Sequence, residues 1–400
     1  MSRRPSHLEL VVILGALTAF APLAIDMYLP ALPTLERAFA ASTAEVQRTL
    51  ATFFLGFALG QAFYGPVADR FGRKPPLYVG LVLFALASIA CALAQSVEAL
   101  TALRFLQAIG ACSGAVMARA MVRDLFEPRE TARIYSALML VMGVAPILAP
   151  LIGGYLLLWF GWEAIFWLLA ALAAVSVAAV AFRLPETHDR STAHSLSLGS
   201  VLSRYAGLLT DRHFMGYALS GGMNAAGMFA YIAGSPFVFI ELYQVAPEHY
   251  GWIFGTNAAG LILASQINGR IVHRFGADRI LRLGNLLQTI AALVLVLTAA
   301  TGLGGLLGIA VPLFIYVGCV GLVSPNAIAL AMASQGAQAG SASALVGTLQ
   351  FSIAAIAATA VGAIHRQSAL PMAIIIAICG ALGLILHRRL VGGTASGRAA

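Results

Sequence analysis

The sequence predicts an all-α polytopic membrane protein with twelve transmembrane helices arranged in two pseudo-symmetric six-helix halves. Three observations carry this prediction: the composition, the lengths of the apolar runs and an internal repeat. Of the 400 residues, 60% are hydrophobic and only 10% are charged, whereas soluble domains usually carry about 25% charged residues. Because the deficit of charge extends over the whole chain, we expect a membrane protein rather than several soluble domains.

Twelve apolar runs are long enough to cross a bilayer, which takes about 20 residues in an α-helix. We expect helices, because open strands in lipid would leave backbone groups unpaired. The first run is expected to be an uncleaved span, since it is too long for a signal peptide and lacks a small-residue cleavage site. The runs lie near residues 8–31, 46–68, 77–96, 99–121, 133–158, 162–183, 213–240, 250–271, 280–300, 304–332, 340–364 and 369–388.

The placement of arginine and lysine predicts the orientation. Basic residues gather at both ends of the chain and at four of the five breaks on the same side, whereas the other side holds only Arg37, Arg48 and Arg366. The break between the tenth and eleventh runs carries no charge. By the positive-inside rule, both termini are expected in the cytoplasm. The net charge of +8 is explained by this placement, so we expect no binding of nucleic acid.

One long polar stretch divides the chain. We expect residues 1–183 to form an N-terminal six-helix half, 184–211 a cytoplasmic linker and 212–400 a C-terminal six-helix half. The stretch GPVADRFGRKPPL after the second run and GRIVHRFGADRIL after the eighth both read G-x-V/I-x-x-R-F-G. The repeat falls at the equivalent place in each half. Parallel repeats of this kind are typical of secondary transporters, whose central site lies between the halves.

The first copy of this repeat is the more informative. Gly65 can let a helix pack closely on a neighbour, Gly72 suits a tight turn, and Asp69 can interact with the positive N-terminus of another helix. The stretch GPVADRFGRKP resembles motif A of the major facilitator superfamily, and the resemblance covers the whole chain. LTALRFLQAIGA resembles motif B, with Ala108 in place of a glycine.

A further stretch, APILAPLIGGYL, resembles motif C, the signature of antiporters, although Ala145 and Ala149 replace two of its glycines. The stretches AIDMYLPALP, MVRDLF and SPFVFIELYQVAPEHYG are similar to the bicyclomycin and chloramphenicol resistance branch of drug:H⁺ antiporters. The residues that the resemblance assigns to the antiporter motif are Pro146, Pro150, Gly153 and Gly154.

The resemblance also implies a gating motif. In this family the aspartate of motif A engages the start of span 11, and a later arginine pairs with an acid near the end of span 4. These roles fall on Asp69 and on Arg73, with Asp124 as the partner of Arg73. The residues of the gating motif are Gly65, Asp69, Arg70, Gly72, Arg73 and Asp124.

Among the few charged residues inside the apolar runs, Asp26 in the first and Arg104 in the fourth are the candidates for function. Such a charge at a helix centre costs roughly 2.5–3.5 kcal/mol on insertion scales and is a functional hypothesis by default. Asp26 lies between Pro22 and Pro30, which loosen the helix. Low-dielectric surroundings favour the protonated form of a carboxyl group, and a nearby cation favours the charged form. We therefore expect Asp26 to carry a proton, with Arg104 as its electrostatic partner; the sequence leaves open whether they touch.

Polar and aromatic side chains within the runs are the candidates for contact with the substrate. A mixed aromatic and polar cavity suits varied apolar drugs, because such surfaces can adapt their shape. Each of these residues could also serve packing or hydrogen bonding between helices. They are Tyr28, Gln47, Phe53, Phe54, Gln61, Asn224, Phe229, Tyr231, Asn257, Asn326 and Gln350.

The function predicted is proton-coupled efflux of several drugs by alternating access, with small, largely apolar substrates such as bicyclomycin or chloramphenicol. An exporter of small peptides or amino acids, or a proton-coupled nutrient importer, is the alternative. The chain holds no G-x-x-x-x-G-K-[ST] and only one lysine, which argues against an ATP-driven pump. It shows no nucleophile–base pair or metal-ligand spacing, so we expect neither an enzyme nor a cofactor or metal. The expected partners are drugs, H⁺ and lipid, with the protein as a monomer.

Overall fold

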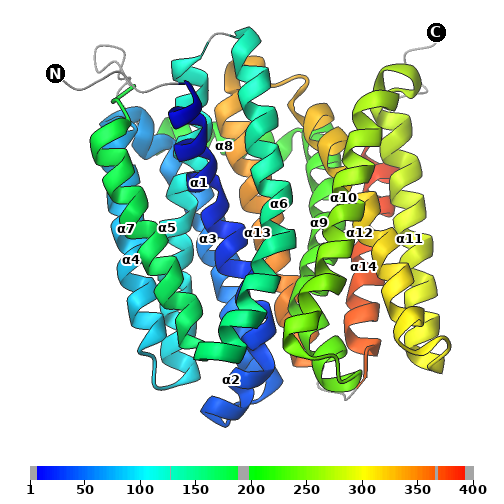
Figure 1. Ribbon diagram of the computed structural model, residues 1–400. Helices are drawn as coiled ribbons and strands as arrows, with labels where there is room; N and C mark the ends of the chain where they lie inside the picture. Colours follow the sequence, from blue (N-terminus) through cyan, green and yellow to red (C-terminus); the bar gives the residue numbers. More distant parts are fainter. Residues whose placement is uncertain (1–6, 127, 188–197, 365–367, 392–400) are drawn as a thin grey trace, which may run out of the picture.

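The computed structural model describes residues 7–126, 128–187, 198–364 and 368–391 (Figure 1), and within these ranges it is almost wholly helical, with no strand. Figure 1 shows a bundle of long helices that run side by side. The first and last described residues and α8 lie at the same end, at the top of the figure, which we call the linker end. The opposite end, at the bottom, carries α2 and is called the α2 end.

The N-terminal half holds six long helices and a short elbow. The elbow consists of η1 (Leu29–Ala31) and α2 (Leu32–Phe39). The long helices are α1 (His7–Asp26), α3 (Thr43–Phe71), α4 (Lys74–Ala92), α5 (Val97–Leu125), α6 (Pro128–Phe160) and α7 (Glu163–Arg183).

The C-terminal half repeats the pattern of six long helices. Short turns of η3 (Phe237–Leu242), η4 (Gly336–Gln338) and η5 (His387–Val391) adjoin them. The long helices are α9 (Arg212–Pro236), α10 (Pro247–Phe275), α11 (Ala277–Thr301), α12 (Gly305–Met332), α13 (Ala339–Ala363) and α14 (Leu370–Leu386).

Within the described ranges, eleven helical segments are long and apolar enough to cross a membrane, and α10 is the long helix that is not among them. Its 29 residues include polar side chains in mid-helix. Two of these, Asn257 and Asn268, are buried and hydrogen-bonded to Tyr231 and Asn326 of neighbouring helices. Because α10 packs against α6 and α12, these groups meet protein rather than lipid, and the helix keeps its place in a twelve-helix bundle.

The ends of the predicted spans shift for local reasons. The first run does not continue as one helix to residue 31, because Pro30 starts a separate 3₁₀ turn after Asp26. The second begins earlier than predicted, at Thr43, where Ser42 and Glu45 form a capping box.

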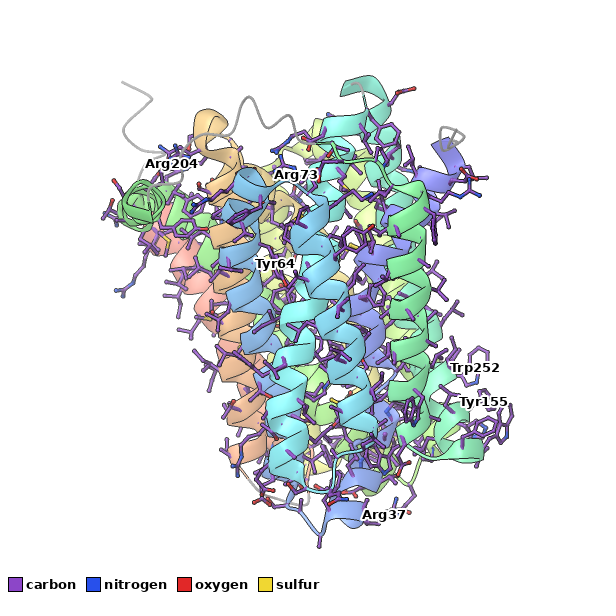
Figure 2. All side chains as sticks on the ribbon, turned by 90° about the vertical axis from the view of Figure 1, so that its left-hand side faces the viewer. Arg37, Tyr64, Arg73, Tyr155, Arg204 and Trp252 are labelled. Carbon is purple, nitrogen blue, oxygen red and sulfur yellow. The ribbon has the colours of Figure 1, made fainter. Side chains whose placement is uncertain are left out.

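The two halves meet through two pairs of helices, α3 with α13 and α6 with α10. Figure 1 shows α13 at the boundary, beside helices of the N-terminal half. Two exposed tryptophans lie towards the α2 end: Trp159 is 66% and Trp252 is 62% exposed, and Figure 2 shows Trp252 and Tyr155 pointing outward on one side there. Aromatic rings of this kind are typical of a membrane–water interface.

The segment predicted as a linker ends in a helix, α8 (Leu198–Thr210). Figure 2 shows α8 end-on beside Arg204, lying across the bundle at the linker end. The hydroxyl of Tyr205 donates to the carbonyl oxygen of Ala62 in α3 at 3.4 Å, and α8 also contacts α9 and α13. The helix therefore rests on both halves. Residues 188–197 of the predicted linker lie outside the described residues.

Candidate functional site

Asp26 is the last residue of α1 and is buried, with 4% of its surface exposed. The helix breaks directly after it, and α6 packs against this break. A Cβ atom on Gly153 of α6 would overlap the carbonyl oxygen of Met27. Among the described residues, Asp26 has no recorded hydrogen bond or ion pair. Its carboxylate lies close enough to Tyr231 and Tyr250, in the other half, for its charge to act on both hydroxyls.

Four polar residues of α9 and α10 complete this group, which we call the Asp26 cluster: Asp26, Tyr231, Ser235, Tyr250 and Asn257. The Nδ2 atom of Asn257 donates to the Tyr231 hydroxyl at 2.9 Å, and the hydroxyls of Ser235 and Tyr250 lie 2.7 Å apart. All five side chains are buried. The only charge in the cluster thus comes from one half, and the hydroxyl and amide groups come from the other.

Arg104 lies elsewhere, fully buried inside the N-terminal half. Its guanidinium carbon is 4.5 Å from the ring centroid of Tyr28 and 4.3 Å from that of Phe53. Its Nη1 donates to Gln107 at 2.6 Å, and Gln107 in turn donates to Ser88 at 2.7 Å. Cation–π contacts and this relay compensate part of the cost of burying the charge.

Direct pairing of Asp26 with Arg104, which the sequence left open, is absent among the described residues. No carboxylate oxygen lies within 4.0 Å of Arg104 there, and its Nε and Nη2 atoms have no hydrogen-bond partner. The two side chains point in different directions. Arg104 is surrounded by the rings of Tyr28, of Phe53 in α3 and of Phe166 in α7, whereas Asp26 faces α9 and α10.

Several predicted substrate residues meet where the two halves touch. Phe54 of α3 lies 4.8 Å, centroid to centroid, from Phe229 of α9, which is 5.2 Å from Phe351 of α13. The amide of Gln47 donates to the carbonyl oxygen of Ala233 at 3.0 Å, across the halves. Gln61 accepts from Arg119 at 3.0 Å. Phe54, Phe229 and Gln47 thus lie at the boundary, with Tyr231 and Asn257 in the Asp26 cluster.

Other candidates are held inside one half. Tyr28 bonds to Thr49 at 2.9 Å, and Phe53, like Tyr28, covers Arg104. Asn224 donates to Asn285 at 2.7 Å within the C-terminal half. Asn326 donates to Asn268 at 2.6 Å. Their contacts in this structure serve packing within a half.

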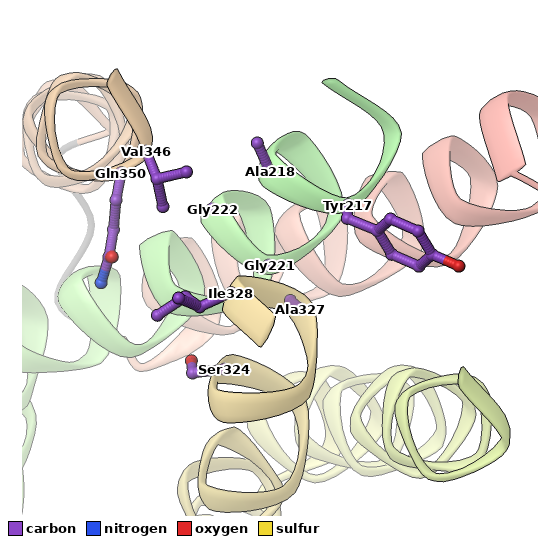
Figure 3. Close-up of a pocket in the computed structure, with 9 residues that line it drawn as sticks. All are labelled: Tyr217, Ala218, Gly221, Gly222, Ser324, Ala327, Ile328, Val346 and Gln350. Carbon is purple, nitrogen blue, oxygen red and sulfur yellow. The ribbon is translucent and has the colours of Figure 1, made fainter. Parts of the chain in front are cut away.

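Gln350 lines a small pocket between α9, α12 and α13 (Figure 3). Its volume is about 10 Å³, enough for about one water molecule and far too small for a drug. Figure 3 shows Gln350 and Val346 facing Gly222 and Ile328 across it, while the ring of Tyr217 points away. In this state, Gln350 has no drug-sized space beside it in this pocket.

The gating residues form a charge cluster at the linker end. The Nε of Arg73 lies 2.9 Å from an oxygen of Asp124, and its Nη1 lies 2.8 Å from Asp69. The Arg73 side chain is 6% exposed. The expected Arg73–Asp124 pair is therefore present. Arg70 points to solvent, beside the ring of Phe71.

Two expectations for the gating motif differ from the structure. Asp69 bonds to Arg73 rather than to the start of α13, and its side chain is 63% exposed. Gly65 has no atom within 4 Å of where a Cβ would lie, and neither does Gly269, its repeat counterpart. Both glycines lie towards the linker end, and in this state they do not mediate close packing.

A further partner of this cluster, Glu186 at the start of the linker, was not predicted from the sequence. Its two carboxylate oxygens accept the backbone N–H groups of Arg73 at 2.9 Å and Lys74 at 3.0 Å, at the start of α4. The Lys74 ammonium donates to the carbonyl of Leu184 at 2.7 Å. Gly72, at φ +89°, leaves room for the carboxylate. The linker is thereby clamped to the turn between α3 and α4.

Replacing this carboxylate tests the clamp. Glu186→Gln is expected to lower the melting temperature, because losing a charged cap at a helix N-terminus costs about 0.5–2 kcal/mol. Thermal unfolding in detergent measures it. Glu130→Gln, at an exposed glutamate in the first turn of α6, is the control at the same end. Equal melting of the two variants would contradict the clamp.

The antiporter motif gives α6 two close contacts. Pro146 and Pro150 lie inside the helix, and Gly153 faces Met27, directly after the end of α1. At Gly154, a Cβ would lie 2.8 Å from the carbonyl oxygen of Pro247 at the start of α10. Small residues on two adjacent positions therefore let α6 touch both α1 and α10, beside the Asp26 cluster.

Comparison with known proteins agrees with this architecture. The family model described as "Major Facilitator Superfamily" matches residues 14–359 of this chain. The "Uncharacterized MFS-type transporter YdgK" of Bacillus subtilis is 39% identical over 379 residues, 94% of each chain. The "Bicyclomycin resistance protein homolog" of Haemophilus influenzae is 32% identical over 387 residues, 97% of each chain.

A solved structure shows the same fold at low identity. The xylose transporter XylE from E. coli, in a partially occluded inward-open conformation, superposes with a TM-score of 0.75 at 15% identity, covering 96% of this chain and 97% of its own. The chain is thus a multi-pass membrane transporter and not an enzyme. It belongs to the Major Facilitator Superfamily, in the branch that includes the bicyclomycin resistance proteins.

Proposed function

We propose that this protein is a proton-coupled exporter of small, largely apolar drugs in the bacterial cytoplasmic membrane, with its linker end in the cytoplasm. The observation that carries the proposal is Asp26, a buried carboxylate from one half that faces hydroxyl groups of the other. The relative named for bicyclomycin resistance supports the substrate class. The basic residues at the linker end support the orientation.

The contacts between the halves fit a state closed at the α2 end. Gln47 bonds to Ala233, and Gly154 packs on Pro247, both near that end. Towards the linker end, Gly65 and Gly269 have no neighbour within 4 Å of a Cβ position. We take this as the inward-facing state, in which Asp26 is closed off from the periplasm.

Coupling then follows from the position of Asp26. A charged carboxylate without a partner is costly in a buried site, whereas the neutral acid is not. Rocking the halves apart at the α2 end would separate Asp26 from Tyr231 and Tyr250 and give it access to periplasmic protons. If the proton favours one of the two states and the drug favours the other, they shift the equilibrium between these states in opposite directions. This is the condition for exchanging a drug for a proton.

The aromatic contacts at the boundary are the proposed place for the drug. Phe54, Phe229 and Phe351 touch one another across the halves. When the halves move, these contacts must change, and the exposed rings offer stacking surfaces to an apolar molecule. Such surfaces bind by shape and area rather than by a fixed set of hydrogen bonds, in keeping with several substrates.

The exchange can be measured in everted membrane vesicles whose lumen is acidified by respiration. Bicyclomycin or chloramphenicol added from outside is expected to release protons from the lumen only when the protein is present. A pH-sensitive dye measures this release. A host without its own efflux pumps should also gain tolerance to the same drugs. Proton release by dipeptides or amino acids but not by drugs would overturn the substrate class. Uptake of a nutrient without drug tolerance would overturn export.

A further inference from the structure

A groove of about 510 Å³ lies between α3 and α5, near the α2 end and away from the boundary of the halves. Its walls come from a short stretch of each helix. Because it lies on the side of the N-terminal half, it is separate from the Asp26 cluster and from the aromatic contacts. The lining residues are Glu45, Arg48, Thr52, Val97, Glu98, Thr101, Ala102, Phe105 and Leu106.

One end of the groove is charged. One carboxylate oxygen of Glu45 accepts the backbone N–H of Ser42 at 2.8 Å and its hydroxyl at 2.7 Å, and the charge of Arg48 also acts on this carboxylate. Arg48 and Glu98 lie at the same end of the groove, both exposed. Neither has an ion pair within 4.0 Å among the described residues. The mouth therefore presents the guanidinium of Arg48 and the carboxylate of Glu98, neither of which is held in a close ion pair.

The rest of the groove is apolar. From Glu98 to Leu106 the wall runs eight residues along α5, about 12 Å at 1.5 Å per residue. Phe105 and Leu106 lie at its far end, and the Leu106 side chain is 41% exposed. The Thr52 hydroxyl donates to the carbonyl oxygen of Thr101 at 3.1 Å. This bond links the two helices. The hydroxyl hydrogen of Thr52 is therefore already hydrogen-bonded within the protein.

A charged mouth above an apolar trough, at the edge of a membrane span, matches the chemistry of a lipid. We propose that the groove binds one phospholipid with a zwitterionic headgroup that carries a primary ammonium, as in phosphatidylethanolamine. Arg48 contacts the phosphate, Glu98 accepts hydrogen bonds from the ammonium, and an acyl chain lies along Phe105 and Leu106. The exposed tryptophans at the same end of the bundle place the mouth near the headgroup level.

Charge complementarity selects this headgroup over others. A guanidinium binds a phosphate through charge-assisted hydrogen bonds, and a carboxylate needs a donor that the trimethylammonium of phosphatidylcholine lacks. Phosphatidylglycerol offers no cation to Glu98. The site therefore distinguishes phosphatidylethanolamine from both through Glu98, while Arg48 contributes to the binding of all three.

The test is native mass spectrometry of the purified, delipidated full chain with equimolar phosphatidylethanolamine, phosphatidylcholine and phosphatidylglycerol. The wild type is expected to retain phosphatidylethanolamine at least about five-fold more than either competitor, because only its ammonium can donate a charge-assisted hydrogen bond to Glu98. Glu98→Gln should remove this preference, and Arg48→Gln should weaken the binding of all three lipids. Arg37→Gln, on α2 outside the groove, is the matched control and should behave as the wild type.

Three results would overturn the proposal: equal retention of all three lipids by the wild type, an unchanged preference in Glu98→Gln, or displacement of phosphatidylethanolamine by tetraphenylphosphonium, which would make the groove a site for lipophilic cations. The melting temperature of each delipidated variant is measured alongside, and Glu98→Ala, which also removes the carboxylate, replaces Glu98→Gln if that variant unfolds. The readout is binding alone, so failure or success of drug export does not affect it.

Discussion

Replacing Asp26 with asparagine is expected to abolish proton-driven drug transport and to leave the protein folded. Asparagine keeps the shape of the side chain but cannot take up or release a proton, and a neutral amide at a buried site carries no charge to desolvate. In everted vesicles, drug-dependent release of luminal protons should fall to the level of vesicles without the protein. Exchange of labelled drug down its own gradient should persist, because that step needs no proton.

The control for Asp26→Asn is Glu241→Gln, at an exposed carboxylate in η3 near the same end of the bundle. It should keep normal drug-dependent proton release, since its charge lies outside the Asp26 cluster. Undiminished pH-driven transport by Asp26→Asn would refute the role of this carboxylate in coupling. Loss of both coupled transport and drug exchange would instead point to a structural role at the boundary.

The second large effect is expected at Gly153, where even a methyl group has no room. A Cβ there overlaps the carbonyl oxygen of Met27, an atom of the backbone that cannot rotate away. Gly153→Ala must therefore push α6 from α1 beside Asp26, and overpacking of this kind costs about 1–3 kcal/mol. We expect a lower melting temperature in detergent and little or no drug export.

Gly65→Ala is the matched control for this substitution, because the same methyl group meets no atom within 4 Å in the structure. It should melt like the wild type. If Gly65→Ala melts normally but exports slowly, Gly65 packs closely only in the opposite state of the transport cycle. Equal melting temperatures for Gly153→Ala and Gly65→Ala would contradict the close contact between α6 and α1.

Much of the fold could be predicted because a bilayer imposes strict length and polarity on each span. The twelve apolar runs correspond to twelve long helices, and even the polar α10 was placed by its length and by the repeat at its end. The helix ends were less predictable. They depend on local events such as the capping box at Ser42 and the proline at position 30, whose effects extend over only a few residues.

The candidate site was predictable only in part. The Arg73–Asp124 pair could be identified from a resemblance in motif, and it is present at 2.9 Å. Glu186 was missed, because its partners are backbone groups that leave no pattern in the sequence. Ser235 and Tyr250 lay within a stretch that resembles the resistance branch, but nothing in that stretch distinguished them from packing residues.

The sequence by itself determined that Asp26 and Arg104 are charges embedded in apolar spans, because only composition and position decide that. The tertiary structure alone decided that they do not meet. A helix repeats every 3.6 residues, so the direction of a side chain depends on how the whole helix is rotated in the bundle. That rotation is set by the packing of neighbouring helices, which turns Asp26 towards Tyr231 and Tyr250 and leaves Arg104 among the rings of its own half.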